Sequence, residues 1–148
     1  KALLESADLT SFAMITGGKG IHIVLIVKPK LEWDEFKQFA GDVAEQIAAL
    51  DPKRFVANMS KAKRKGRIFI DYLRNGRGAT AIAPYSPRAR GTAPIAVPVS
   101  WDELKTLPAA SVFKLKDMRA RLNEPDPWAD YAKSAVSITK ATRSKLGL

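Results

Sequence analysis

Residues 11–27 read SFAMITGGKGIHIVLIV, two apolar segments on either side of the turn Thr16-Gly17-Gly18-Lys19-Gly20. We predict strands over 11–15 and 21–27, because short apolar runs bounded by glycine are typical of buried strands. The glycines allow the turn backbone conformations that other residues avoid, so the two strands are expected to form a hairpin. The second strand is apolar on both faces, which favours a central place in its sheet.

A long amphipathic helix is predicted over residues 33–50, followed by the stop signal Asp51-Pro52. Its apolar residues recur at spacings of three and four, which predicts that this stripe packs on the sheet and that its aromatic residues lie in the core. The stripe consists of Trp33, Phe36, Ala40, Val43, Ile47 and Leu50.

A basic loop over 59–66 leads into a predicted strand over 67–73. A glycine-rich turn at 75–78 then returns the chain into 79–83, which favours a second hairpin. The proline-punctuated residues 84–98 are expected to be irregular.

Ser100 and Glu103 have the spacing of a capping box, which predicts a short helix after Ser100. A further short helix is expected over 116–122. After Trp128 the chain becomes small and polar, so residues 134–148 are interpreted as a mobile tail or linker.

The length and composition are those of one compact globular unit. We expect an α/β (α+β) fold, a mostly antiparallel sheet with packed helices. Hydrophobic residues make up 46% of the 148 residues and charged residues 27%. Cysteine is absent, which excludes disulfides and thiolate metal sites and suits a cytoplasmic protein. The longest apolar run is too short to span a membrane, and no membrane partner is expected. The chain begins with Lys1, so we expect a processed or truncated product.

The excess positive charge lies in one segment. Between Lys53 and Arg90 the chain has eleven Lys or Arg residues and a single acid, Asp71, so this segment carries the whole net charge of +10. A localised basic surface attracts polyanions and releases their counterions on binding, which indicates nucleic acid or nucleotide binding. The alternative is a solvated basic face that favours solubility.

His22, the only histidine, follows the glycine-rich turn in an otherwise apolar strand. A single histidine among apolar residues is often a satisfied core residue. Beside Gly17-Gly18-Lys19-Gly20 it is also a candidate to contact a phosphate, because glycine backbone N–H groups and a lysine attract anions. The turn lacks the Lys-Ser/Thr ending of a Walker loop.

Asp71 is expected on a strand of apolar neighbours, where a buried carboxylate needs compensation. An ion pair with Arg67 or Arg74 is one interpretation, and a metal ligand at the strand's end is the other. Four arginines near this acid, with His22, can hold a triphosphate and its metal or follow a nucleic acid backbone, and spacing does not separate the two. They are Arg64, Arg74, Arg88 and Arg90.

Three stretches, 16–22, 59–75 and 83–90, resemble the polymerase domain of bacterial ligase D, a member of the archaeo-eukaryotic primase superfamily that acts in non-homologous end joining. The likeness runs from about Ser11 to Trp128. It implies a primase-polymerase-like core lacking its amino-terminal part, with residues 1–133 as the carboxy-terminal part of that domain.

The resemblance implies a DNA repair nucleotidyltransferase that fills gaps and extends DNA ends, prefers ribonucleotides and uses Mn²⁺ or Mg²⁺. It implies catalytic roles for His22 and Asp71, with Asp71 as metal ligand. The implied partners are DNA with gaps or double-strand-break ends, an NTP, a Ku-type end-binding protein and the ligase domain of the same polypeptide. The implied nucleotide-binding residues are Thr16, Lys19, His22, Arg64, Arg74, Arg88 and Arg90.

One motif of that family is missing. Its Asp-x-Asp pair should precede the histidine motif, but only Glu5 and Asp8 stand upstream of His22. Two-metal transfer needs carboxylates that hold two ions about 4 Å apart, which Asp71 alone does not provide. The chain is therefore expected to be an inactive fragment of a polymerase. The alternative is a non-catalytic module that binds nucleic acid or nucleotide.

Overall fold

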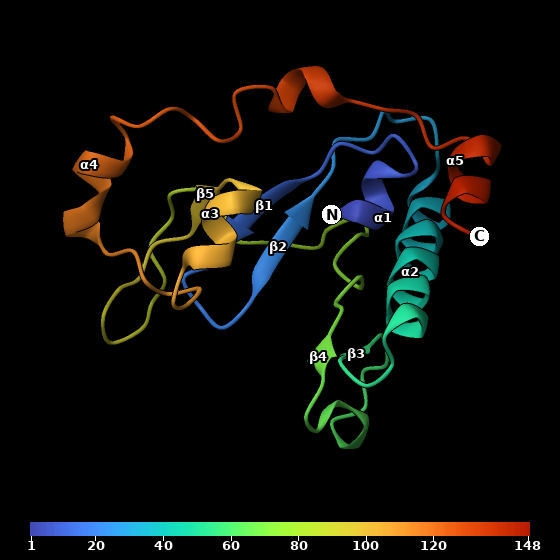
Figure 1. Cartoon of the computed structure of the whole chain (residues 1–148), viewed down its shortest axis with the longest axis horizontal. Helices are drawn as coiled ribbons and strands as arrows, with labels where there is room; N and C mark the ends of the chain where they lie inside the picture. The colour runs from blue at the N-terminus through green and yellow to red at the C-terminus, as the bar shows by residue number, and fades with distance from the viewer. The chain divides into compact units, whose positions relative to one another are not determined.

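The computed structural model describes all 148 residues, Lys1 to Leu148 (Figure 1). Instead of the single unit expected, the chain forms two compact units, and neither is continuous in sequence. Unit 1 contains residues 1–9, 27–81 and 137–148, and unit 2 contains residues 10–26 and 82–136. Length and composition could not predict this, because the segments of the two units alternate along the chain. None of the helices combines the length and apolar character needed to cross a lipid bilayer.

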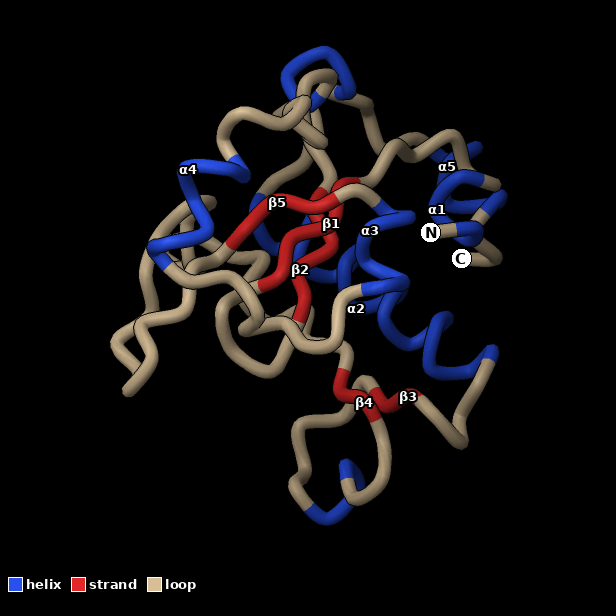
Figure 2. The backbone as a smooth tube through the Cα atoms, turned by 60° about the vertical axis from the view of Figure 1, so that its left-hand side comes forward, coloured by secondary structure: helices blue, strands red, loops and turns tan.

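Unit 2 is built on an antiparallel sheet in which β1 (Phe12–Ile15) lies between β2 (Ile21–Val24) and β5 (Val97–Val99) (Figure 2). The predicted hairpin of β1 and β2 is confirmed. The prediction of a central second strand is wrong, because β1 takes the centre and all four of its residues are buried. In β2, Ile21 and Ile23 are 45% and 40% exposed.

The strand β5 arises from the stretch expected to be irregular. Pro98 stands opposite Met14 in the middle of β5, and its missing N–H makes the segment a poor strand by sequence. The position is tolerated because β5 is at the edge of the sheet, where a residue needs partners on one side only.

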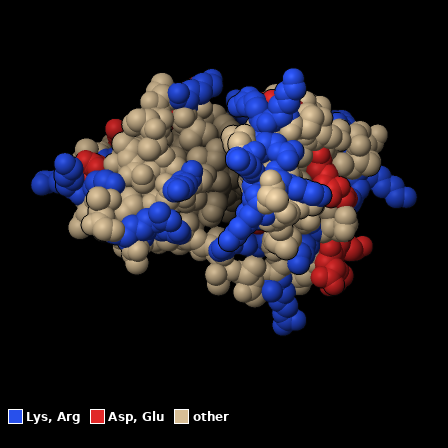
Figure 3. Space-filling model, turned by 90° about the horizontal axis from the view of Figure 1, so that it is seen from below, with Lys and Arg blue, Asp and Glu red and all other residues tan.

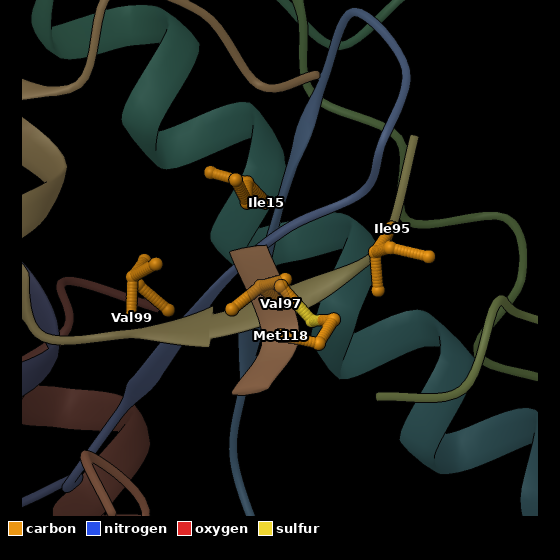
Figure 4. Close-up of a cluster of buried hydrophobic side chains, with 6 residues drawn as sticks. Ile15, Ile95, Val97, Val99 and Met118 are labelled. Atoms are coloured by element: carbon orange, nitrogen blue, oxygen red, sulfur yellow. The ribbon is translucent and has the colours of Figure 1, made fainter. Parts of the chain in front are cut away.

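The core of unit 2 lies on one face of this sheet (Figure 4). Ala13 and Ile15 from β1 meet Val97 and Val99 from β5, and Ile95 and Met118 complete the buried cluster. The helix α3 (Trp101–Thr106) and the loop that follows it add partly buried apolar residues to the same cluster. These are Trp101, Leu104, Leu107, Ala110, Val112 and Phe113.

The short helices of unit 2 follow local signals. The capping box predicted for α3 is confirmed, since the Ser100 hydroxyl accepts a hydrogen bond of 3.0 Å from the Glu103 N–H. The helix expected over 116–122 is present as the 3₁₀ turn η2 (Leu115–Asp117) followed by α4 (Met118–Arg121). A further 3₁₀ turn, η3, spans Tyr131–Ser134.

Unit 1 pairs two very short strands in parallel, β3 (Phe55–Val56) and β4 (Ile68–Phe69). The expected second hairpin is absent, and residues 79–83 form no strand. The strand predicted over 67–73 ends early, because the Asp71 carboxylate accepts a hydrogen bond of 3.1 Å from the Leu73 N–H and the chain turns there. The 3₁₀ turn η1 (Ala62–Arg64) lies in the loop between the two strands.

The predicted long helix of unit 1 is confirmed as α2 (Trp33–Leu50), which ends at the non-helical Asp51. Its buried residues are Phe39, Gly41 and Ala44. Trp33 and Leu50, at the two ends of the predicted stripe, are 55% and 66% exposed, so the expectation that the helix's aromatics all lie in the core is wrong for Trp33. The sequence shows the periodicity but not how far the packed surface extends.

The two chain ends also belong to unit 1. Near the amino terminus, α1 spans Ala2–Glu5. The segment expected to be a mobile tail contains α5 (Lys140–Lys145), capped by the Thr139 hydroxyl. Leu146 is only 1% exposed, and Arg143 lies 5.1 Å from the Phe39 ring centroid and 3.5 Å from the Asp42 carboxylate. These few contacts attach a mostly polar segment to α2, which the sequence composition does not reveal.

Candidate nucleotide-binding site

The glycine-rich turn of unit 2 is closed by Thr16, whose side chain is buried. Its hydroxyl donates a hydrogen bond of 2.7 Å to the Gly20 carbonyl and accepts one of 3.3 Å from the Gly18 N–H. The Thr16 N–H also donates to the Gly20 carbonyl at 3.2 Å. Thr16 therefore fixes the loop between β1 and β2, and its hydroxyl is already engaged within the protein.

Two arginines converge on this turn. Gly17 has φ +65°, and a Cβ there would lie 2.9 Å from the Arg88 Cγ and 3.0 Å from the Pro94 carbonyl oxygen. A Cβ on Gly18 would lie 3.6 Å from the Arg90 Nη2 and 3.9 Å from the Arg88 Nη2. Both guanidinium groups thus lie close to the backbone at Gly18, and the approach of the Arg88 Cγ and the Pro94 carbonyl to Gly17 depends on glycine.

The segment that carries the arginines is held by backbone hydrogen bonds to core residues. The Arg88 N–H donates to the Pro94 carbonyl at 2.8 Å, and Pro87 forms a β-bridge with the buried Ile95. The Tyr85 N–H donates to the Ala96 carbonyl at 2.7 Å although Tyr85 has φ +61°. The two arginines are therefore positioned by the same cluster that holds the sheet together.

Tyr85, in the same segment as the two arginines, has a shifted pKa. Burial raises the pKa of its phenol above the usual value of 10, and the nearby Asp126 carboxylate raises it further, against a smaller lowering by Arg121. The phenol therefore stays neutral at ordinary pH and adds no charge beside the arginines.

The turn concentrates positive charge that no carboxylate neutralises. Neither Arg88 nor Arg90 forms an ion pair, and Lys19 is exposed at the tip of the turn. Guanidinium forks match the oxygens of phosphate groups, and glycine N–H groups bind anions. This part of unit 2 therefore has the chemistry of an anion site.

His22 lies on β2 opposite Met14 and is half-buried. Because side chains alternate along a strand, it projects from the face of the sheet opposite the core residues Ala13 and Ile15. His22 and Lys19 thus belong to the same unit as Arg88 and Arg90.

Asp71 lies in unit 1, where its environment differs from the expected one. It follows β4 instead of lying on a strand, and it is exposed, so the premise of a buried carboxylate is wrong. The ion pair with Arg67 or Arg74 is not formed, because Arg67 donates to the Pro52 carbonyl at 3.4 Å and Arg74 to the Thr80 carbonyl at 3.0 Å. One oxygen of Asp71 bonds only to the Leu73 N–H, and the carboxylate stays accessible.

The residues of this chain do not by themselves make a two-metal site. No group of three or more His, Cys, Asp or Glu side chains is close enough to hold a metal ion. An exposed carboxylate is a suitable ligand for Mg²⁺ or Mn²⁺, so Asp71 fits the role of one ligand in a larger set.

Arg64, also in unit 1, is held by protein contacts. Its guanidinium lies 3.7 Å from the centroid of the Phe69 ring, and its Nη2 donates to the Met59 carbonyl at 2.6 Å. The structure thus brings Thr16, Arg88 and Arg90 together around Gly17 and Gly18, whereas Arg64, Arg74 and Asp71 each contact their own neighbours in unit 1. Sequence reasoning missed the role of the Pro94 carbonyl, which accepts the Arg88 N–H and lies beside Gly17. No spacing rule connects Pro94 with Gly17.

Comparisons with known proteins agree on one family. The family model described as "LigD, primase-polymerase domain" matches residues 1–128. The multifunctional non-homologous end joining protein LigD of Pseudomonas aeruginosa is 43% identical over 98% of this chain, and that of Mycolicibacterium smegmatis is 32% identical over 84%. The chain spans only 18% and 16% of these two relatives.

A solved structure has the same fold. The polymerase domain from Mycobacterium tuberculosis ligase D in complex with DNA matches with a TM-score of 0.80 and 26% identity. The match covers 89% of this chain and 46% of the solved one. The predicted mixed α/β fold with an antiparallel sheet is therefore confirmed.

Proposed function

This chain belongs to the LigD primase-polymerase domain family, and on that premise we propose that it is part of a DNA repair nucleotidyltransferase of non-homologous end joining. Its proposed task is to fill gaps and extend DNA ends, with ribonucleotides preferred. The observation that supports this most is the convergence of Arg88 and Arg90 on the backbone of Gly18, in a turn closed by Thr16.

In the proposed reaction the turn binds the triphosphate of the incoming nucleotide. Arg88 and Arg90 provide two planar forks free of carboxylates, and Lys19 adds a third positive charge. Charge that develops on the leaving pyrophosphate is stabilised by such fixed donors, which need no reorganisation during the reaction. His22 is proposed to contact the same triphosphate, and Arg74, whose guanidinium has donors beyond its bond to Thr80, is proposed to bind it also.

A divalent ion, Mn²⁺ or Mg²⁺, would activate the primer hydroxyl and stabilise the pyrophosphate. Asp71 is proposed as one ligand, because its carboxylate is exposed and unpaired. Since these residues hold no cluster of three ligands, the remaining carboxylates would have to come from outside them. We therefore propose that the 148 residues alone do not extend a primer.

A non-catalytic binding module is the second candidate. It is favoured by the same isolated carboxylate together with the net charge of +10. Under this alternative the chain holds nucleic acid or nucleotide and requires no metal. A Ku-type protein, the ligase domain of the same polypeptide and a cytoplasmic location are proposed only for the polymerase.

The deciding experiment is gap filling on a 5′-phosphorylated gapped duplex with Mn²⁺ and ribonucleotides. It compares the 148-residue chain with a version extended at its amino terminus through an Asp-x-Asp motif. The polymerase proposal expects extension only by the longer protein, and loss of that extension when Arg88 and Arg90 are both replaced by Gln. A matched Lys28→Gln, Lys30→Gln variant, with the same charge change elsewhere, should keep activity.

The two candidates differ in their response to Asp71→Ala. Loss of metal-dependent nucleotide binding supports the polymerase. Unchanged or stronger phosphate binding, with no extension by either protein, would establish the binding module instead.

A further inference from the structure

The chain that leaves β4 runs back along α2, and both belong to unit 1 (Figure 1). The helix residue Gly41 is buried, and a Cβ on it would lie 3.0 Å from the Cε2 and 3.3 Å from the Cδ2 of the Tyr72 ring. One helical turn earlier, the Lys37 Cδ would lie 3.7 Å from a Cβ on Gly76. Segment 72–76 therefore lies against one face of α2 and contacts it at both of its ends.

The close contact exists because residue 41 is glycine. Gly41 lies inside an 18-residue helix, where only proline is less favourable, and its helical backbone conformation does not require glycine. The separation of 3.0 Å is shorter than the distance of about 3.5 Å or more at which carbon atoms pack best. Any side chain at this position would therefore push the Tyr72 ring away from the helix.

The backbone of Tyr72 is held as firmly as its ring. The Asn75 side-chain amide donates to the Tyr72 carbonyl at 2.8 Å, and the Asn75 N–H donates to the same carbonyl at 3.1 Å. The Leu73 N–H donates to the Asp71 carboxylate at 3.1 Å. The carboxylate is thus joined to a residue whose ring and carbonyl are both fixed.

The charges around Asp71 do not attract a cation. Asp71 is the single acid among eleven Lys or Arg residues between Lys53 and Arg90. Figure 3 views the molecule from the side of β3 and β4, and Lys and Arg side chains crowd part of this face while Asp and Glu gather at its margin. A divalent ion gains little from such surroundings, so its binding depends on well-placed carboxylate oxygens.

We propose that Tyr72 and Gly41 are positioning residues, which determine where the Asp71 carboxylate lies in a divalent-metal site. The inference rests on the proposed function, because it takes Asp71 as a metal ligand. The Tyr72 ring holds its segment against α2, and the helix thereby fixes the neighbouring carboxylate. Replacing groups that orient a metal ligand typically changes metal affinity by about 10- to 100-fold.

The test measures Mn²⁺ binding by electron paramagnetic resonance, without nucleotide or DNA, on the protein extended at its amino terminus through an Asp-x-Asp motif. Gly41→Val pushes the ring outward and should weaken Mn²⁺ binding about tenfold. Tyr72→Ala removes the ring and should have a similar effect. Tyr72→Phe keeps the ring atoms that contact α2, so it should bind Mn²⁺ like the unmodified protein.

The two residues should act through their one contact. In a protein that already carries Tyr72→Ala, Gly41→Val should cause no further loss of Mn²⁺ affinity, because the ring that it displaces is absent. Additive losses would mean that each residue acts by a separate route, and the proposal would be wrong.

Leu146→Ala tests whether the role is merely structural. Its side chain is 1% exposed in unit 1, so the variant loosens that unit, yet below its unfolding midpoint it should keep its Mn²⁺ affinity. Gly41→Ala, in contrast, raises helix propensity, so Mn²⁺ affinity should fall without a matching loss of stability in urea unfolding. Equal losses of Mn²⁺ affinity in Leu146→Ala and Gly41→Val would overturn the proposal.

Asp71→Asn separates failure of this inference from failure of the proposed function. If Asp71→Asn weakens Mn²⁺ binding and Gly41→Val does not, Asp71 remains a metal ligand and the positioning role is wrong. If Asp71→Asn leaves Mn²⁺ binding unchanged, Asp71 is no ligand and both are wrong. Mn²⁺ binding that follows the expected pattern in a protein that fails to fill gaps supports the inference and contradicts only the polymerase activity.

Discussion

The guanidinium of Arg64 lies 3.7 Å from the centroid of the Phe69 ring, which connects the end of η1 to the strand β4. The same group donates to the Met59 carbonyl at 2.6 Å, so it bridges the start of the loop and the strand that follows it. In this arrangement the Arg64 side chain stabilises the conformation of the basic loop. A role in triphosphate binding, implied by family resemblance, would require it to leave the ring.

Arg64→Gln should therefore lower the free energy of unfolding by about 1 kcal/mol, the size of a half-exposed cation–π contact. The measurement is urea unfolding followed by circular dichroism. Lys63→Gln removes the same charge from an exposed neighbour and should leave stability nearly unchanged. Equal effects of the two substitutions would show that charge, and not the contact with Phe69, matters.

Gly17→Ala should destabilise the protein and weaken triphosphate binding. The residue has φ +65°, and its Cβ would meet a backbone carbonyl at 3.0 Å as well as Arg88, so the arginine segment must move. We expect urea unfolding to show a free energy of unfolding lower by about 2 kcal/mol or more. Calorimetric titration should show a parallel loss of affinity for the nucleoside triphosphate.

Gly66→Ala is the matched control for that prediction. Gly66 has φ +71° but nothing within 4 Å of the added Cβ, so only backbone strain of about 1 kcal/mol is expected. Triphosphate affinity should not change. If Gly66→Ala weakens nucleotide binding as much as Gly17→Ala, the turn at Gly17 is not the anion site.

Arg121→Met should destabilise unit 2. The Arg121 side chain is 8% exposed and forms a double ion pair with Glu103, at 2.6 and 2.8 Å, besides donating to the Pro98 carbonyl. Removing Arg121 leaves the Glu103 carboxylate without this partner, and we expect the free energy of unfolding to fall by about 2 kcal/mol. The fall is smaller than for a fully buried pair because Glu103 is 25% exposed.

The surface pair of Lys105 and Asp102 supplies the comparison for Arg121. Its side chains are 75% and 91% exposed, so Lys105→Gln should change the unfolding midpoint very little. If Lys105→Gln destabilised the protein as much as Arg121→Met does, burial would not explain the larger contribution expected of the Arg121 ion pair.

Leu146→Ala should lower the free energy of unfolding by about 2–4 kcal/mol, because the side chain is 1% exposed and its removal leaves a cavity. Leu148→Ala, at a residue 38% exposed, should have a small effect. Thermal unfolding of both variants tests whether residues 137–148 are an integral part of unit 1. Similar melting temperatures for Leu146→Ala and the unmodified chain would restore the interpretation of a loose tail.

Signals confined to a few residues predicted structure well. The periodic stripe identified α2 to the residue, Ser100 and Glu103 identified the start of α3, and the glycine turn identified the hairpin of β1 and β2. Each depends on local geometry, on a cap or on a turn, which a short window of sequence contains.

Features that depend on distant pairing were not predicted. Nothing near Pro98 indicates that β1 needs a third strand, and the parallel pairing of β3 with β4 depends on residues more than ten positions apart. The residue types of the candidate site were recognised, but Asp71 was expected to be buried on a strand. Its own side chain ends the strand by bonding to the Leu73 N–H, a competition that apolar periodicity does not show.

The interleaving of the two units has a consequence for the order of folding during synthesis. Unit 1 needs α1, α2 and α5, and Lys145 of the last helix is ion-paired with Asp8 near the amino terminus. All of the segments of unit 2 have left the ribosome once residue 136 has emerged, whereas unit 1 stays unfinished until Leu146 is released. The buried face of α2 therefore stays without part of its packing surface while more than ninety further residues are added.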